Sequence, residues 1–202
     1  MLNRLAVFLT DRLEKHIPVD DDDREIYIYS FELLLSNLSS ALTMLLISLI
    51  FKRIGILSFF FFILFFFTTR LFCGGYHSKT HLRCFLLTNA IFLSCAGLTE
   101  LVLRFNLKLM MPVLFLLSAV TVFIFSPVKN KNHPCTEETY KKNRKISLVL
   151  TSIYTVIYIL LFIYMKNDGV VVNAAWSFVW VGLMIAGEKI FEKGGKTHEV
   201  FG

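Results

Sequence analysis

The chain has 202 residues, of which 55% are hydrophobic and 21 are phenylalanine, and its formal net charge at pH 7 is +6. Soluble domains are about half apolar as well, but polar residues interrupt their apolar runs regularly. The long uninterrupted runs here exclude an ordinary soluble or disordered protein. They predict an all-α, polytopic integral membrane protein.

The first 17 residues predict an amphipathic surface helix. Apolar residues recur on one side of this segment, while charged residues occupy its flanks and its opposite side. A cleavable signal peptide needs an uninterrupted apolar core, and the charges at positions 11, 12, 14 and 15 exclude one. The four aspartates at 20 to 23 predict a solvated linker and a helix-start signal, so residues 1–23 should form a surface helix and an acidic linker.

Six apolar runs follow, and most approach the ~20 residues that a helix needs to cross the hydrocarbon of a bilayer. They cover residues 27–51, 54–69, 85–103, 109–126, 146–165 and 170–187. The second run is the shortest, and as a helix it would be about 24 Å long. We expect one membrane-embedded domain over residues 1–202, with about six transmembrane helices.

The distribution of lysine and arginine predicts the orientation of these helices. The N-terminal segment has four such residues, residues 70–84 three, residues 127–145 six and the C-terminal tail three, whereas the remaining connections have five together. By the positive-inside rule, both termini and the stretch 70–84 face the cytoplasm. The anionic inner leaflet then accounts for the basic excess without nucleic acid as a partner. Because the cytoplasm is reducing, we expect free thiols.

The stretch RLFCGGYHSKTHLRC, residues 70–84, concentrates reactive side chains at a membrane edge. Two cysteines and two histidines fall within 12 positions: Cys73, His77, His81 and Cys84. Any one of them alone could be a bystander in a polar connection between helices. Their density at a membrane boundary, beside a glycine pair that permits close backbone approach, favours a functional site.

A zinc site is one interpretation of this stretch, because two cysteines and two histidines suit tetrahedral coordination. On a continuous helix, however, residues 73 and 84 would lie about 16 Å apart along the axis, so the chain would have to fold back. No H-E-x-x-H motif supplies a general base for zinc-dependent hydrolysis. We therefore expect neither a metal ion nor another cofactor.

A cysteine nucleophile with a histidine base is the favoured interpretation. Thiols are usually activated by a nearby imidazole and by a helix N-terminus, and Cys84 directly precedes the third apolar run. Free backbone N–H groups at that helix start could also stabilise an oxyanion. If the stretch is helical, His81 neighbours Cys84, whereas His77 lies about 10.5 Å away along the axis. His77 becomes the base only if the chain folds back.

The chain resembles the accessory gene regulator protein B (AgrB) family, the bacterial membrane endopeptidases that process the precursor of a cyclic quorum-sensing peptide. Over about residues 25 to 190, three motifs carry the resemblance: EIYIYSFELLLSNL, RLFCGGYHSKTHLRC and SPVKNKNHP. In the second motif the spacing of Arg70, Gly75, His77 and Cys84 matches the family.

The resemblance implies the roles of the residues in that motif. Cys84 would be the nucleophile and His77 the base, with Arg70, Gly74 and Gly75 in support. The implied reaction removes the C-terminal tail of an AgrD-like precursor through an acyl-enzyme thioester, and the precursor then cyclises to a thiolactone or a lactone. The implied location is the bacterial cell membrane.

Three positions depart from the pattern of the family. Cys73 stands where a small uncharged residue is expected, so it could be a spectator or a second reactive thiol. Ser126 replaces the usual alanine, and Lys129 stands where an acidic residue is common. These changes leave the catalytic pair untouched.

The basic segment 127–145 has two interpretations. It serves first as a positive-inside anchor, and it could also capture the acidic tail of the precursor by long-range attraction. Six cations would make up this substrate-binding set: Lys129, Lys131, Lys141, Lys142, Arg144 and Lys145. Besides the precursor, the expected partners are membrane lipids and, as a homodimer, a second copy of the chain.

Two other functions remain as alternatives. One is a small metal-handling or transport membrane protein with a Cys/His site, and the other is a non-catalytic receptor or scaffold. A transporter is expected to have polar or glycine- and proline-interrupted spans and weak internal repeats. The apolar runs of this chain contain few polar residues, and no repeat is evident in its sequence.

Overall fold

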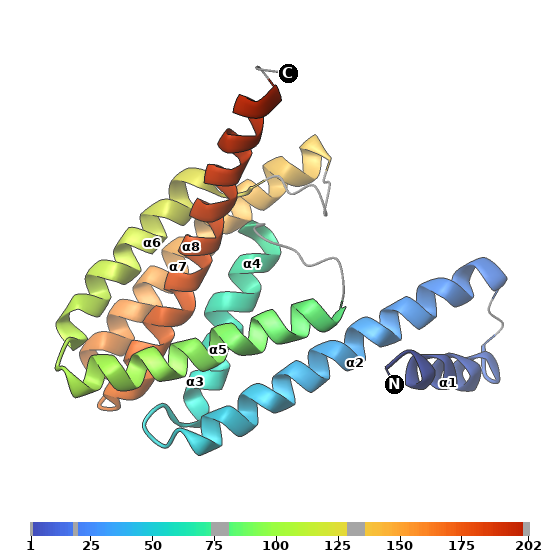
Figure 1. Cartoon of the computed structure of the whole chain (residues 1–202), viewed down its shortest axis with the longest axis horizontal. Helices are drawn as coiled ribbons and strands as arrows, with labels where there is room; N and C mark the ends of the chain where they lie inside the picture. The colour runs from blue at the N-terminus through green and yellow to red at the C-terminus, as the bar shows by residue number, and fades with distance from the viewer. Residues whose placement is uncertain (1, 18–19, 74–80, 129–135, 200–202) are drawn as a thin grey trace.

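The computed structural model describes residues 2–17, 20–73, 81–128 and 136–199. In these residues the regular secondary structure is entirely helical, which confirms the all-α prediction (Figure 1). The helices in chain order are α1 (Leu2–Glu14), α2 (Asp21–Ile50), α3 (Gly55–Phe62), η1 (Ile63–Phe67), α4 (Thr68–Cys73), α5 (His81–Arg104), η2 (Lys108–Met110), α6 (Met111–Phe125), α7 (Glu137–Tyr164) and α8 (Asp168–Glu199).

Five segments of the described chain are long and apolar enough to cross a membrane: α2, α5, η2 with α6, α7 and α8. The second predicted crossing is a shorter apolar helix, Gly55–Phe67. It continues without a break through α4, so the helix reaches Cys73 and passes the end of the apolar run 54–69. Within it, η1 is a π-helical turn, which shifts the phase of the side chains that follow.

Helix α8 is the central helix of the bundle. Most of its membrane-crossing length is buried, whereas less than a third is buried in α2, α6 and α7. Its most extensive neighbour is α6, and at their contact a Cβ added to Gly182 would lie 2.9 Å from the Cβ of Ser118. Small residues at such a contact let two helices approach closely, which is how helices associate in a bilayer.

A cluster of aromatic rings joins α6, α7 and α8 to the second crossing. Phe115 of α6 stacks on Tyr158 at 4.1 Å and on Phe178 at 4.7 Å between ring centroids. Phe65 of η1 lies 5.1 Å from the ring of Tyr154. These rings occupy the centre of the buried core, so the four elements form one packed unit.

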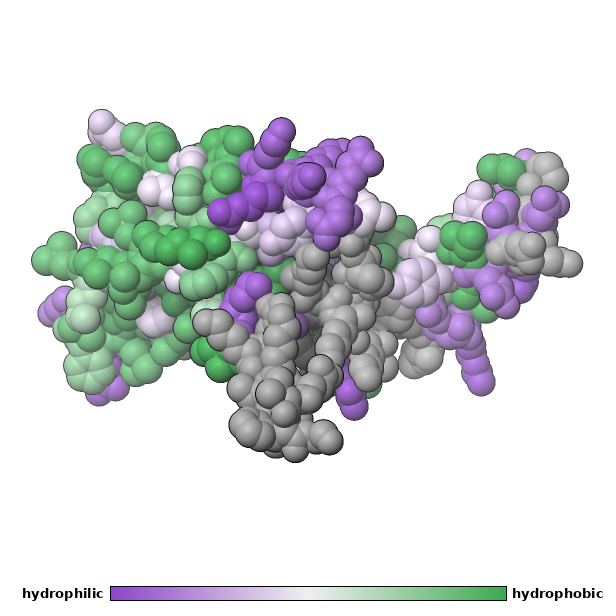
Figure 2. Space-filling model, turned by 90° about the horizontal axis from the view of Figure 1, so that it is seen from above, coloured by the Kyte–Doolittle hydropathy of each residue, from purple (hydrophilic) through white to green (hydrophobic). Residues whose placement is uncertain are grey.

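The outer surface of the bundle is apolar. Large hydrophobic side chains of α2, α5, α6 and α7 are exposed, including Leu46, Leu93, Leu117 and Val156. Figure 2 shows hydrophobic residues over most of the bundle. The largest group of hydrophilic residues lies at the top centre of this view, others lie on the projecting part at the right, and a few lie at the left and lower edges. A surface of this kind suits lipid as the surrounding solvent, in agreement with the membrane class expected from the composition.

The predicted N-terminal helix is present as α1, which lies alongside the first half of α2 (Figure 1). Arg24 of α2 pairs with Asp11 and Glu14, each at 2.7 Å. The expected acidic linker is shorter than predicted, because α2 already begins at Asp21. Carboxylates in a first turn face the positive end of the helix dipole, so they favour a helix start as well as a linker.

The connections between helices meet at the two ends of the bundle. At one end, Arg53 pairs with Glu100 at 3.4 Å, and Lys108 pairs with Asp168. At the other end, the backbone N–H of Val128 donates a hydrogen bond of 3.0 Å to the carbonyl of Cys73. Connections that alternate between two ends are what six successive crossings require.

Replacing Gly182 with alanine should destabilise the bundle, because the added methyl group would collide with Ser118. Overpacking of this kind costs about 1–3 kcal/mol. Gly97→Ala in α5 is the matched control, since, apart from the adjoining backbone of α5, no described atom lies within 4 Å of its added Cβ. Thermal unfolding in detergent should show a lower midpoint for Gly182→Ala and no decrease for Gly97→Ala. Equal midpoints would contradict a close contact between α6 and α8.

Candidate active site

Cys84 lies in the first turn of α5, as the fourth residue of a helix that begins at His81. Its side chain is partly exposed. Farther along the same helix face lie Thr88, Cys95 and Thr99, all of them buried. Cys84 therefore occupies the end of the inward face of α5, where the helix emerges from the bundle. The helix begins at His81, earlier than predicted, so Cys84 lies within its first turn and not directly before it.

The three cysteines that the structure describes lie in different environments. Cys73 and Cys95 are completely buried, and only Cys84 is partly accessible. None of the three is in a disulfide. Cys135 lies outside the described residues. Among the described thiols, only Cys84 can be reached by a substrate without a rearrangement of the bundle.

Cys73 ends α4, beyond the apolar part of the second crossing. Burial raises the pKa of its thiol to about 11, although Ser126, Ser147 and the positive charge of Arg144 act in the opposite direction. At neutral pH this thiol is therefore protonated. Of the two roles left open for Cys73, the environment favours a spectator over a second reactive thiol.

The two histidines of the stretch are described unequally. His77 lies outside the described residues, as do Gly74 and Gly75. His81 is the first residue of α5, three positions before Cys84, so the backbone makes these two residues neighbours on one helix. Arg70 belongs to α4, whose backbone is described, but its side chain is not. The choice between His77 and His81 remains a prediction.

The SPV part of the third motif contacts the second motif at Cys73. Ser126, Pro127 and Val128 follow α6 and are all buried. The hydrogen bond from the N–H of Val128 to the carbonyl of Cys73 joins this segment to the last residue of α4. Two motifs that lie about 50 residues apart in the sequence are thus held together directly before the residues that carry His77.

The basic segment 127–145 is only partly a loop, because α7 begins at Glu137. Thr136 caps this helix, and its hydroxyl accepts a hydrogen bond of 3.2 Å from the N–H of Thr139. Lys141, Lys142 and Lys145 are exposed. Lys129 and Lys131 lie outside the described residues.

Arg144 differs from the exposed lysines of this segment. It is partly buried, and its guanidinium donates a hydrogen bond to the backbone carbonyl of Ser126. The spacing of Arg144, Ser147, Thr151 and Tyr154 repeats at three and four residues, and this repeat marks the inward face of α7. That periodicity was visible in the sequence and would have separated Arg144 from the other cations.

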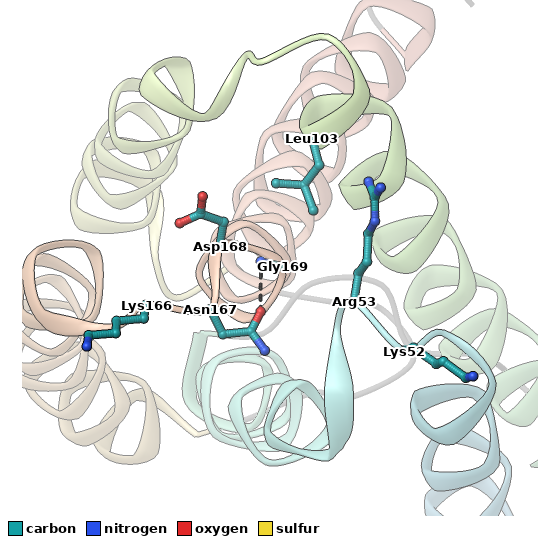
Figure 3. Close-up of a pocket in the computed structure, with 7 residues that line it drawn as sticks. All are labelled: Lys52, Arg53, Leu103, Lys166, Asn167, Asp168 and Gly169. Carbon is teal, nitrogen blue, oxygen red and sulfur yellow. Dashed lines mark hydrogen bonds between the residues drawn. The ribbon is translucent and has the colours of Figure 1, made fainter.

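A pocket of about 440 Å³ opens at the opposite end of the bundle (Figure 3). Its lining residues are Lys52, Arg53, Leu103, Lys166, Asn167, Asp168 and Gly169. The side-chain oxygen of Asn167 accepts hydrogen bonds from the N–H groups of Gly169 and Val170, which caps α8. None of the lining residues is a cysteine or a histidine, so the pocket offers no thiol or imidazole chemistry.

The described residues contain no group of three or more His, Cys, Asp or Glu side chains arranged to hold a metal ion. The predicted zinc ligands include His77 and His81, whose side chains are not described. Cys73, the first residue of that set, is buried beside Ser126, Ser147 and Arg144. A neighbouring guanidinium disfavours a cation at this position.

Comparison with known proteins identifies relatives along most of the chain. The profile of the Accessory gene regulator B family matches residues 6–185. "Putative AgrB-like protein 2" of Clostridium perfringens strain 13 is 28% identical over 84% of this chain and 81% of its own length. "Putative AgrB-like protein" of C. perfringens strain SM101 is 28% identical over 89% of this chain and 83% of its own length.

A third relative, "Putative AgrB-like protein" of Clostridium beijerinckii, is 32% identical over 66% of this chain and 63% of its own length. No solved structure matches the chain significantly. The profile match covers the partly exposed cysteine, the helix that carries it and the two motifs joined at Cys73. The chain therefore belongs to the Accessory gene regulator B family.

Proposed function

We propose that this chain is a membrane-embedded cysteine endopeptidase that removes the C-terminal tail of an AgrD-like precursor and promotes its cyclisation. Membership of the family supports a role in the accessory gene regulator quorum-sensing system, with an AgrD-type precursor as partner. The observation that carries the proposal is the partial exposure of Cys84 in the first turn of α5, because the other described cysteines are buried.

The first half of the reaction is peptide-bond cleavage. The sulfur of Cys84 attacks a carbonyl carbon near the C-terminal part of the precursor, and His77 accepts the thiol proton. The histidine then donates that proton to the nitrogen of the leaving amine. The C–N bond breaks, the tail departs, and the precursor remains on Cys84 as a thioester.

The second half of the reaction is ring closure. A cysteine of the precursor attacks the thioester, its proton passes to the Cys84 thiolate, and a thiolactone is released. A serine in the same place would give a lactone. Backbone N–H groups at the start of α5 are suitable donors for the oxyanion in both halves, since a helix leaves its first N–H groups without intrahelical acceptors.

The orientation of the protein follows from its charge distribution. Residues 70–84 and both termini face the cytoplasm, because the connections on that side contain most of the lysine and arginine. The exposed Lys141, Lys142 and Lys145 then lie on the same side as Cys84. They provide a positive surface for the acidic tail of the precursor.

Replacing Cys84 with alanine should abolish precursor cleavage without affecting membrane insertion, because no other accessible thiol is described near it. Cys73→Ala, Cys95→Ala and Cys135→Ala should retain substantial activity. Cleavage is measured on a peptide precursor with isolated membranes. An active Cys84→Ala beside an inactive Cys73→Ala would assign the nucleophile to Cys73.

His77→Ala should lose about 10²- to 10⁴-fold in kcat, the usual contribution of general acid–base catalysis, and His81→Ala should lose less. The thiol of Cys84 should also react with an acyl analogue at neutral pH in a manner that depends on His77. If His81→Ala is inactive and His77→Ala is active, the helical neighbour is the base. Chelators should not change the activity of either variant. Stoichiometric bound zinc would instead support the metal-handling alternative.

Exchange of Lys141, Lys142 and Lys145 for glutamine should raise the KM for the precursor more than it lowers kcat, because long-range attraction brings the acidic tail to the enzyme. Added salt should weaken binding more in the wild type than in the triple variant. Topology is checked by labelling on both sides of the membrane. An unchanged KM with correct topology would leave these lysines as a positive-inside anchor only.

A further inference from the structure

Arg144 occupies an inward position on α7. Arg144, Ser147, Thr151 and Tyr154 follow the helical repeat of the buried face, whereas Lys145 beside them is exposed. Helix α7 packs against α4 along this face. The side chain of Arg144 is thus directed toward the end of α4 and away from the exposed basic surface.

The guanidinium of Arg144 binds the C-terminal end of α6. It donates to the carbonyl of Ser126, the residue that directly follows the helix in an extended conformation. Helix C-termini leave carbonyl groups without intrahelical donors and have a partial negative charge. A partly buried, charge-assisted hydrogen bond from an arginine satisfies both features.

The next contact in this series reaches α4. Val128, two residues after Ser126, donates its N–H to the carbonyl of Cys73 at 3.0 Å. The residues joined by Val128 are almost inaccessible, with Cys73 0% exposed, Ser126 2% and Val128 5%, and Arg144 is partly buried. We call Ser126–Val128, together with Arg144 and Cys73, the 126–128 clamp.

We propose that Arg144 is a positioning residue that, through the 126–128 clamp, holds the end of α4 in the place that catalysis requires. The proposal rests on the proposed function, because both members of the proposed catalytic pair follow Cys73 closely in the sequence. His77 comes four positions after Cys73, and Cys84 comes eleven positions after it. Misplacement of a reacting group by about 1 Å can lower a rate about 10²-fold. Arg144 touches no reacting atom in this assignment.

The helix contacts around the clamp do not depend on Arg144. The hydroxyls of Tyr154 and Thr68 share a hydrogen bond of 2.5 Å, and the ring of Phe65 contacts that of Tyr154. These contacts join α7 to the second crossing almost three turns farther along α7 than Arg144. Loss of the guanidinium should therefore loosen the end of α4 while the bundle stays folded.

Kinetics distinguish positioning from substrate capture. Arg144→Gln should lower kcat about 10²-fold with little change in KM, and Arg144→Lys should recover part of this loss because an ammonium still donates to the Ser126 carbonyl. Arg104→Gln, which removes the same charge from an exposed site at the other end of α5, is the control. A rise in KM at unchanged kcat for Arg144→Gln would overturn the proposal.

Alkylation of Cys73 tests the clamp without any enzymatic activity. In a Cys84→Ala, Cys135→Ala background, a membrane-permeant maleimide should react with Cys73 at least several-fold faster when Arg144 is glutamine, because the 126–128 clamp no longer covers the thiol. Lys145→Gln should leave this rate unchanged. If Arg144 acted on Cys73 only through its charge, its loss would raise the pKa of the thiol further and slow the reaction. A slower or unchanged rate overturns the clamp.

The two experiments separate this proposal from the proposed function. An active Cys84→Ala would reject the cysteine endopeptidase, but the alkylation rate would still report on Arg144. Conversely, equal alkylation rates would reject the clamp and leave the assignment of Cys84 intact. Thermal unfolding of Arg144→Gln in detergent should keep its cooperative transition within a few degrees of the wild type, and loss of that transition would show that Arg144 holds the whole bundle.

Discussion

The close approach of α6 and α8 at Gly182 and Ser118 is the contact on which the rest of the structure depends. Lipid tails are as apolar as leucine, so helices in a bilayer gain little from burying apolar surface and associate mainly through close packing. A glycine in α8 permits this packing, and α8 becomes the buried centre of the bundle. Around that contact, Phe115 stacks on both Phe178 and Tyr158, which brings α7 against α6 and α8.

The same packing extends to the end of the bundle where the candidate chemistry lies. On the inward face of α7, Tyr154 bonds Thr68 of α4, and Arg144 lies on that face about two turns after the helix start. The carbonyl of Ser126 and the carbonyl of Cys73 are then both satisfied by donors from other segments. A series of contacts thus connects the aromatic centre to the residues next to the candidate active site. The hydrogen bonds to the Ser126 and Cys73 carbonyls lie at the end of this series, where unsatisfied backbone groups near lipid would be costly.

Among the described thiols, burial distinguishes the two cysteines that pack in the interior from the candidate nucleophile. Cys73 and Cys95 fill the interior as small apolar residues do, and burial raises the pKa of the Cys73 thiol to about 11. Cys84 has the same functional group but emerges from the bundle in the first turn of α5. Helix α5 therefore carries a packing cysteine and a candidate nucleophile on one face, and distance along the helix separates their roles.

The sequence by itself determined the membrane class, the positions of the helices and the stretch 70–84 as the candidate site, because the length of apolar runs and the spacing of Cys and His residues are local properties. It underestimated the length of the second helix, since Arg70 to Cys73 continue this helix beyond the apolar run 54–69. Only the tertiary structure decided which described thiol is accessible and which group the inward side chain of Arg144 binds. Both depend on which elements cover a residue, and for Arg144 the covering contact comes from Ser126, eighteen residues earlier in the chain.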